Sequence, residues 1–252
     1  MIDSCAFVGA WPFRRLGRNT VSDLSQSNRR LGIRGAVVSC LDSVFYNDPS
    51  QGDHALAGSL PDGCLFAMTH NPMLPFAAHD VSVNSDHADS LRLFPSIHGY
   101  SPDCAESVAL CQAAASAGLW ITVVYKMDDV RMDYLLRQRI PSFESVANLV
   151  RAVPEATFVL SGFGAENILE NAAAFQALPN LYADIVYSSK VIFPVDALVR
   201  GVSPEKILFA THQCMLCPDI GVLTLDHSSV SPEIREKIAD TNLIRLRKKR
   251  PF

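Results

Sequence analysis

The sequence lacks the features of several large classes of protein. Its 252 residues contain no apolar run approaching the roughly 20 residues that a membrane-spanning helix needs. The formal net charge is −4, so there is no basic excess to hold nucleic acid or an acidic membrane. Asp3 stands where a signal peptide would carry a basic residue. We therefore expect a cytoplasmic protein with neither nucleic-acid nor membrane partners.

A disulfide framework and a phosphate-binding glycine loop are also missing. The 7 cysteines are an odd number spread along the chain, unlike the pattern of a small secreted protein. The first apolar run ends in Val8-Gly9-Ala10-Trp11-Pro12-Phe13, a loop too bulky to cradle a pyrophosphate. This argues against an open doubly wound sheet, the alternative α/β architecture.

What the sequence does contain is a regular alternation of short apolar runs and helical stretches. Most of the runs are continuously apolar, which is typical of parallel strands covered on both faces. Eight strands that alternate with helices over about 250 residues predict an α/β fold, one (β/α)8 TIM barrel domain spanning residues 1–252. The predicted strands are Ile2–Val8, Ile33–Cys40, Cys64–His70, Ser90–Pro95, Trp120–Tyr125, Thr157–Ser161, Leu181–Ile185 and Ile207–Thr211.

Polar side chains gather where these predicted strands end, which is where a barrel of this kind carries its active site. His98 follows the fourth strand and His212 follows the eighth, and both are predicted to be general acid–base groups. His70, after the third strand, is interpreted as a hydrogen-bonded loop residue.

Charged and aromatic residues complete the predicted site. Asp129 and Arg131 follow the fifth strand, where an arginine fork oriented by an aspartate is well shaped to grip a carboxylate. Asp129 is therefore placed in the catalytic group. Arg131, Arg14, Tyr125 and Tyr100 are predicted to bind the substrate.

A lone Cys-x-x-Cys motif lies between Cys214 and Cys217. With His212 upstream and Cys5 on the first strand, these thiols allow a zinc or redox site. A single pair is a weak signal, and buried or loop thiols are the simpler interpretation.

The order of several stretches along the chain resembles the amidohydrolase-related family, whose members are metal-dependent TIM-barrel hydrolases and some decarboxylases. The resemblance implies the barrel fold and a metal centre at the strand ends. The matching stretches are Ile2–Gly9, Ala117–Tyr125, Phe158–Gly164, Leu178–Asp184, Ile207–His212 and Ser231–Leu246.

The metal ligands that this resemblance implies are not present in the sequence. Side chains without ligand atoms stand at several of the expected positions, and a divalent ion needs several N, O or S ligands at one point. We therefore expect no metal centre and no other cofactor. The residues at those positions are Cys5 and Phe7 on the first strand, Val124 or Tyr125 on the fifth, Gly162 after the sixth and His212 after the eighth.

Three functions are consistent with these residues. The first is an amidohydrolase-like hydrolase, or a related lyase, that acts on a small anionic molecule without the metal of the family. The second is a non-catalytic barrel that binds a small ligand or a partner. The third is a zinc hydrolase with a site rebuilt from Cys5, His212 and Cys214, with Cys217 as a further thiol. The sequence does not identify the substrate or the oligomeric state, and a homo-oligomer is one of the alternatives.

Overall fold

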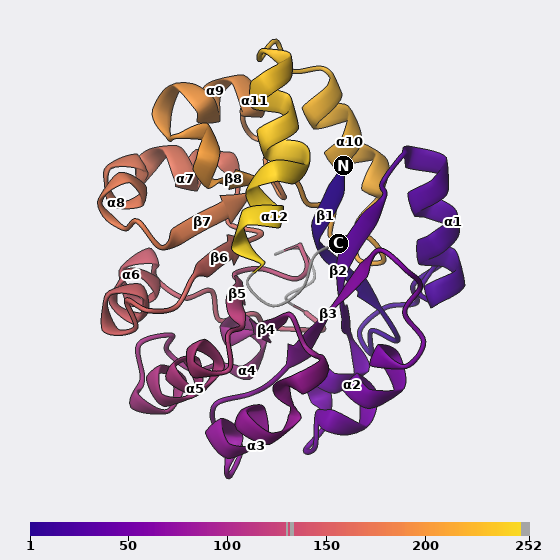
Figure 1. Ribbon diagram of the computed structural model, residues 1–252, viewed down its shortest axis with the longest axis vertical. Helices are drawn as coiled ribbons and strands as arrows, with labels where there is room; N and C mark the ends of the chain where they lie inside the picture. Colours follow the sequence, from indigo (N-terminus) through magenta and orange to yellow (C-terminus); the bar gives the residue numbers. More distant parts are fainter. Residues whose placement is uncertain (130, 132–133, 248–252) are drawn as a thin grey trace.

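The predicted (β/α)8 barrel is confirmed by the computed structural model, which describes residues 1–129, 131 and 134–247. The rest of the predicted domain, residues 130, 132–133 and 248–252, lies outside the described residues. Eight parallel strands follow one another in sequence order, and Figure 1 shows the helices surrounding them. The strands are β1 (Ile2–Val8), β2 (Gly35–Cys40), β3 (Cys64–Thr69), β4 (Ser90–Leu93), β5 (Trp120–Val124), β6 (Phe158–Ser161), β7 (Leu181–Asp184) and β8 (Ile207–Leu208).

Backbone hydrogen bonds close the barrel between β1 and the segment that follows β8. The Ser4 amide donates to the Phe209 carbonyl at 2.9 Å, and the His212 amide donates to the Cys5 carbonyl at 2.9 Å. The Asp3 carboxylate accepts hydrogen bonds from the amide and the hydroxyl of Thr211. The eighth strand is therefore shorter than the predicted Ile207–Thr211, because its last residues leave the regular ladder and bind β1 through these contacts instead.

The helices form the outer ring of the barrel. Thr20 caps α1 because its hydroxyl accepts from the Asp23 amide, while the Asp23 carboxylate accepts from the Thr20 amide. No helix in the described part of the chain combines the length and apolar character needed to cross a membrane. The helices are α1 (Val21–Leu31), α2 (Ser50–Ala57), α3 (Ala77–Asn84), α4 (Pro95–His98), α5 (Ala105–Ser116), α6 (Phe143–Ala152), α7 (Ala165–Glu170), α8 (Ala172–Ala177), α9 (Pro194–Gly201), α10 (Pro218–Asp226), α11 (Pro232–Glu236) and α12 (Asn242–Leu246).

The side chains inside the barrel are stacked in three levels, because every second residue of a strand points to the same face. The level near the amino ends of the strands is apolar, and Leu243 of α12 packs beneath it together with Ile2 and Trp120. The middle level is polar and holds Arg92 and Asp184, both fully buried. The level near the carboxyl ends is apolar again and consists of Cys5, Phe7, Leu41, Phe94, Val124, Met127 and their neighbours. This last level covers the mouth of the barrel.

Candidate functional site

Three polar side chains meet at the carboxyl ends of neighbouring strands. Ser161 ends β6, Asp184 ends β7, and His212 follows β8, so the parallel topology brings them to the same end of the barrel. The Ser161 hydroxyl donates a short hydrogen bond to Oδ2 of Asp184, and its oxygen lies 2.8 Å from Nε2 of His212. All three side chains are fully buried. We call these residues the Ser161 group.

The burial of the Ser161 group changes how its members hold protons. Burial raises the pKa of Asp184 to about 6, although hydrogen bonds from the Ser161 hydroxyl and two backbone amides oppose the shift. Burial lowers the pKa of His212 to about 3, and the nearby Arg92 cation adds to the effect. At neutral pH the carboxyl is therefore ionised and the imidazole is neutral. Because Ser161 gives its only proton to Asp184, we assign the proton of His212 to Nε2, which leaves Nδ1 as an acceptor with no partner among the described residues.

Arg92 is the cation at the centre of the barrel. Its Nη1 donates to the Ala6 carbonyl at 2.6 Å and to the Ser39 hydroxyl at 2.8 Å. Its Nη2 donates to the Val37 carbonyl at 2.6 Å and to the Ser4 carbonyl at 3.2 Å. The sequence analysis did not identify Arg92 as a site residue. The available signal was a single charge within the apolar run Ser90–Leu93.

The two histidines predicted to act together do not contact each other. Nε2 of His98 lies 2.7 Å from the Val44 carbonyl, which fixes this nitrogen as a donor. The ring of His98 contacts Phe94, that of Phe94 contacts Phe7, and that of Phe7 contacts His212, at centroid distances of 6.2, 6.4 and 5.2 Å. Two phenylalanine rings therefore stand between His98 and His212. Of the two, only His212 belongs to the Ser161 group.

The predicted arginines are both held by aspartates near the barrel mouth. Nε of Arg131 lies 2.9 Å from Oδ1 of Asp129, and the Arg131 side chain is 86% exposed. Nε of Arg14 lies 3.1 Å from Oδ2 of Asp128, and its Nη2 donates to the Met215 carbonyl at 2.7 Å. Arg14 thus joins the loop after β1 to the loops after β5 and β8. In this structure Arg14 therefore connects loops on different sides of the barrel mouth.

The predicted tyrosines lie apart from the Ser161 group. The Tyr125 hydroxyl donates to the Pro141 carbonyl at 2.7 Å, and its ring packs against Phe163 at 4.7 Å between centroids. The Tyr100 hydroxyl is buried and has no hydrogen-bond partner among the described residues. Its ring stacks on that of His98 at 6.3 Å. The structure therefore does not gather all the predicted site residues around one cavity.

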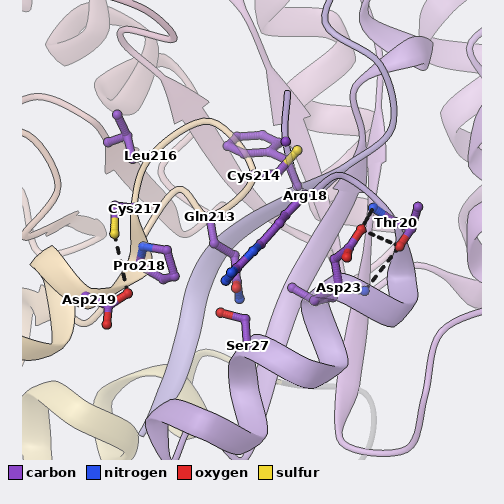
Figure 2. A pocket seen from close by; sticks show the side chains of 13 residues that line it. Arg18, Thr20, Asp23, Ser27, Gln213, Cys214, Leu216, Cys217, Pro218 and Asp219 are labelled. Atoms are coloured by element: carbon purple, nitrogen blue, oxygen red, sulfur yellow. Dashed lines mark hydrogen bonds between the residues drawn. The ribbon is translucent and has the colours of Figure 1, made fainter. Parts of the chain in front are cut away.

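A pocket of about 390 Å³ opens beside the barrel mouth, between the loops that follow β1 and β8. Figure 2 shows Arg18 reaching into this pocket toward Gln213 and Ser27. Phe7 lines the pocket, and its ring touches the imidazole of His212 edge-on. One aromatic ring thus separates the pocket from the Ser161 group.

Comparison with known proteins identifies the fold. No protein-family model and no curated protein sequence matches the chain. A crystal structure described as an amidohydrolase II has 12% identity and a TM-score of 0.73, with 97% of this chain and 98% of that chain covered. A dihydroxybenzoic acid decarboxylase from a Polaromonas species has 12% identity and a TM-score of 0.73, covering 97% and 96%. A 5-carboxyvanillate decarboxylase from Novosphingobium aromaticivorans has 12% identity and a TM-score of 0.72, covering 97% and 95%. The chain therefore has an amidohydrolase-like (β/α)8 fold, as the resemblance in its sequence implied.

The expectation of no cofactor is corrected by these structures, because both decarboxylases were crystallised with bound manganese. We therefore tested the described residues of this chain for a fit to a metal ion. Within residues 1–129, 131 and 134–247, no group of three or more His, Cys, Asp or Glu side chains is arranged to hold one. This includes Cys5, His212 and Cys214, the ligands of the zinc alternative. The described residues do not fit the manganese that the fold implies.

Proposed function

We propose that the protein is a hydrolase or lyase that acts on a small carboxylate. The observation that carries this proposal is the Ser161 group, a carboxyl, a hydroxyl and an imidazole joined by hydrogen bonds at the carboxyl ends of β6 to β8. Active sites of (β/α)8 barrels lie at that end. Buried titratable groups with shifted pKa values are typical of catalytic sites.

The Ser161 group can hold and move a proton between defined atoms. When Asp184 takes up a proton, its carboxyl donates to Ser161 Oγ. The Ser161 hydroxyl then donates to Nε2 of His212, provided that the imidazole proton has moved from Nε2 to Nδ1, so both hydrogen bonds reverse their direction. The pKa of Asp184, raised to about 6, places this exchange close to neutral pH, where general acid–base groups are most effective. Arg92 supplies a fixed positive charge that stabilises negative charge in the same interior.

The substrate class rests on the structural neighbours. Two of them are named for decarboxylation of dihydroxybenzoic acid and 5-carboxyvanillate, which are small carboxylates. Decarboxylation and hydrolysis both require a proton at the reacting atom, and the Ser161 group would supply it. The catalytic roles of His98 and Asp129 and the substrate-binding role of Arg131 stay predictions from the sequence, as does the cytoplasmic location.

The test is a turnover assay on the purified chain with a panel of aromatic and aliphatic carboxylates and lactones. Each is incubated with and without added manganese or zinc, and release of CO2 and of hydrolysis product is measured. We expect turnover, and we expect Ser161→Ala to lower its rate about 100-fold. Ser188→Ala is the matched control, because this buried hydroxyl only donates to the Ile185 carbonyl. Turnover that survives Ser161→Ala would refute the proposed role of the group.

A second candidate function is favoured by the closed barrel mouth. Phe7, Met127 and Met215 belong to one buried apolar cluster above the polar level. Trp11 joins this cluster and donates to Asp128 at 3.2 Å, which ties two loops over the mouth. A barrel sealed in this way suits a protein that binds a ligand or a partner without chemistry. Saturable ligand binding without turnover under any of the metal conditions would support this alternative.

A further inference from the structure

Arg18 is an arginine beside the barrel mouth that the described residues leave available for a ligand. Arg14 is bound to Asp128, and Arg131 is bound to Asp129. Arg18 is exposed, lines the pocket next to Phe7, and makes no hydrogen bond or ion pair with any other described residue. An arginine without a protein partner in a pocket is suited to bind a carboxylate through two parallel hydrogen bonds.

The acidic side chains of this pocket are already occupied. Asp219 accepts from both Nη atoms of Arg30, at 2.6 and 2.7 Å. Asp23 accepts from the amide of Thr20 at 3.1 Å and from its hydroxyl at 2.6 Å, which completes the cap of α1. Neither carboxylate forms an ion pair with Arg18. Hydrogen bonds from Thr20 lower the pKa of Asp23 and the charge of Arg18 contributes to the same shift, but neither carboxylate uses the donors of the guanidinium.

A second, independent observation points to a ligand at the same place. Ser27 lines the pocket with a side chain that is only 7% exposed, and its hydroxyl has no hydrogen-bond partner among the described residues. A buried hydroxyl without a partner is costly. Gln213 beside it is held in place because its amide donates to Asn28 at 2.7 Å. A carboxylate bound by Arg18 would give the Ser27 hydroxyl an acceptor.

The rest of the lining is suited to an apolar ligand body. Leu216 and Pro218 line the pocket with partly exposed side chains, and the buried Leu24 and Phe7 lie behind them. The Phe7 ring also lies 4.9 Å from the guanidinium carbon of Arg92 and touches His212. The fully buried Phe7 therefore stands between the pocket and His212 of the Ser161 group.

We propose that this pocket binds small carboxylates with an apolar body, holding the carboxylate on Arg18 and Ser27. The inference deepens the proposed function, on which it rests, by naming the residues that select the substrate. Sequence reasoning predicted that Arg14 and Arg131 bind the substrate, and in the structure each of them is paired with an aspartate.

The experiment is a calorimetric titration of the intact chain with benzoate, and with benzamide as its neutral isostere. We expect saturable binding of benzoate and binding of benzamide at least about tenfold weaker, because benzamide lacks the charge. Arg18→Gln should weaken benzoate binding about tenfold or more, and Arg18→Lys should restore part of it. Ser27→Ala should weaken it by a smaller factor.

Arg15→Gln is the matched control. Arg15 is also exposed and lies three residues away, but it does not line the pocket. The proposal is overturned if benzoate does not bind, if benzamide binds equally well, or if Arg18→Gln binds benzoate as tightly as the unchanged chain. Binding that depends on Arg18 without any turnover would sink the proposed function alone. Turnover that is lost with Ser161→Ala but unaffected by Arg18→Gln would sink only this inference.

Discussion

The Ser161 hydroxyl oxygen lies 2.8 Å from Nε2 of His212, in a part of the barrel interior that solvent does not reach. The Asp184 carboxylate accepts a hydrogen bond from the Ser161 hydroxyl, so a carboxylate, a hydroxyl and an imidazole are connected in that order. The three residues are far apart in the chain. They meet because consecutive parallel strands end at the same rim, where a short segment after β8 turns back toward β1.

Arg92 places a positive charge near Asp184 and forms hydrogen bonds with β1 and β2 of the barrel. Its Nη atoms bind the carbonyls of Ser4, Ala6 and Val37, which belong to β1 and β2. In Arg92→Met these carbonyls lose their buried donors, and the negative charge of Asp184 loses a nearby cation. We expect the free energy of unfolding to fall by about 3–5 kcal/mol, measured by urea denaturation at neutral pH.

The control for this change is Arg151→Met. Arg151 pairs with Glu144 at 2.9 Å, but both side chains are more than half exposed. An exposed pair of this kind contributes about 1 kcal/mol or less, so the urea midpoint should hardly move. If Arg92→Met unfolded at the same urea concentration as Arg151→Met, the hydrogen bonds of Arg92 would not contribute to the free energy of unfolding.

The contact between Trp11 and Asp128 makes a prediction about the barrel mouth. Oδ2 of Asp128 accepts from Nε1 of Trp11 at 3.2 Å and from Nε of Arg14 at 3.1 Å. Asp128→Ala removes both bonds, and the buried Trp11 ring should become accessible to acrylamide. Fluorescence quenching in a Trp120→Phe background isolates Trp11, since the chain has 2 tryptophans. The quenching constant should rise clearly above that of the parent.

Asp129→Ala in the same background is the control. Among the described residues, Asp129 binds the exposed Arg131 side chain and the Arg131 backbone and forms no hydrogen bond with Trp11, so quenching of Trp11 should stay low. Equal quenching in the Asp128 and Asp129 variants would show that the Asp128 contacts do not hold the mouth closed.

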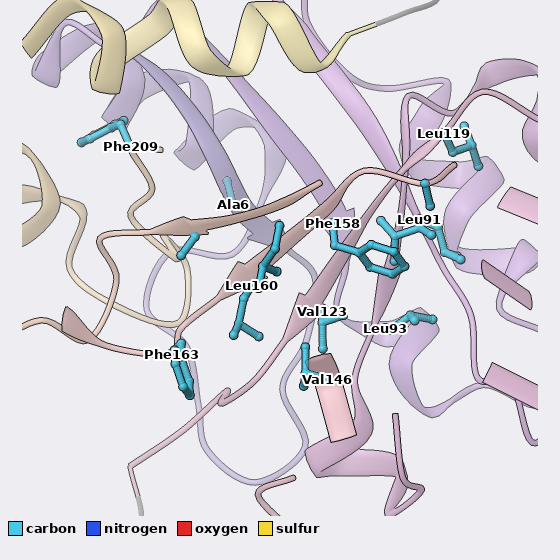
Figure 3. Close-up of a cluster of buried hydrophobic side chains, with 14 of the residues drawn as sticks. Ala6, Leu91, Leu93, Leu119, Val123, Val146, Phe158, Leu160, Phe163 and Phe209 are labelled. Carbon is cyan, nitrogen blue, oxygen red and sulfur yellow. The ribbon is translucent and has the colours of Figure 1, made fainter. Parts of the chain in front are cut away.

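The barrel could be predicted from the sequence because each strand carries its own signal. Leu91, Val123 and Phe158 lie in separate apolar runs, and Figure 3 shows them packed in one buried cluster. Strands buried on both faces need no distant information to be recognised. The end of β8 was the exception. The residues after Leu208 bind β1 through irregular contacts, and the hydrophobic pattern of the sequence does not predict such contacts.

The sequence analysis named His212 as a site residue, but it did not name Ser161 and Asp184, which form one group with His212 in the structure. Asp128 and Asp129 are neighbours in the chain, yet one is 6% exposed and binds Trp11 while the other pairs with Arg131 at the surface. The sequence shows where a strand ends but not which way the next side chains point. Arg92 was missed for a related reason, since its partners on β1 and β2 lie more than 50 residues away along the chain.

The lowered pKa of His212 predicts a particular dependence of stability on pH. Its ordinary value is 6.5, and burial together with Arg92 lowers the pKa to about 3 in the native protein. Below pH 6.5 the unfolded chain therefore takes up a proton that the native chain does not. The native state loses stability as the pH falls from 6.5 toward 3, by about 1.4 kcal/mol per pH unit.

Asp3 and Asp184 act in the opposite direction, because burial raises the pKa of each to about 6. Their contribution is present below the ordinary pKa of 3.8 and is lost as the pH rises through 6. Measuring the wild-type chain alone would therefore mix both effects. His212→Asn separates them, because both aspartates remain and asparagine tolerates the positive φ of 51° at this position.

The measurement is urea unfolding of both chains at pH 7.5 and pH 5. We expect the stability advantage of the wild-type chain over His212→Asn to shrink by about 2 kcal/mol at the lower pH, the cost of keeping the imidazole neutral over 1.5 units. An advantage that stays constant would mean that His212 becomes protonated in the native barrel as readily as in the unfolded chain. The assignment of a neutral His212 imidazole to the Ser161 group would then be wrong.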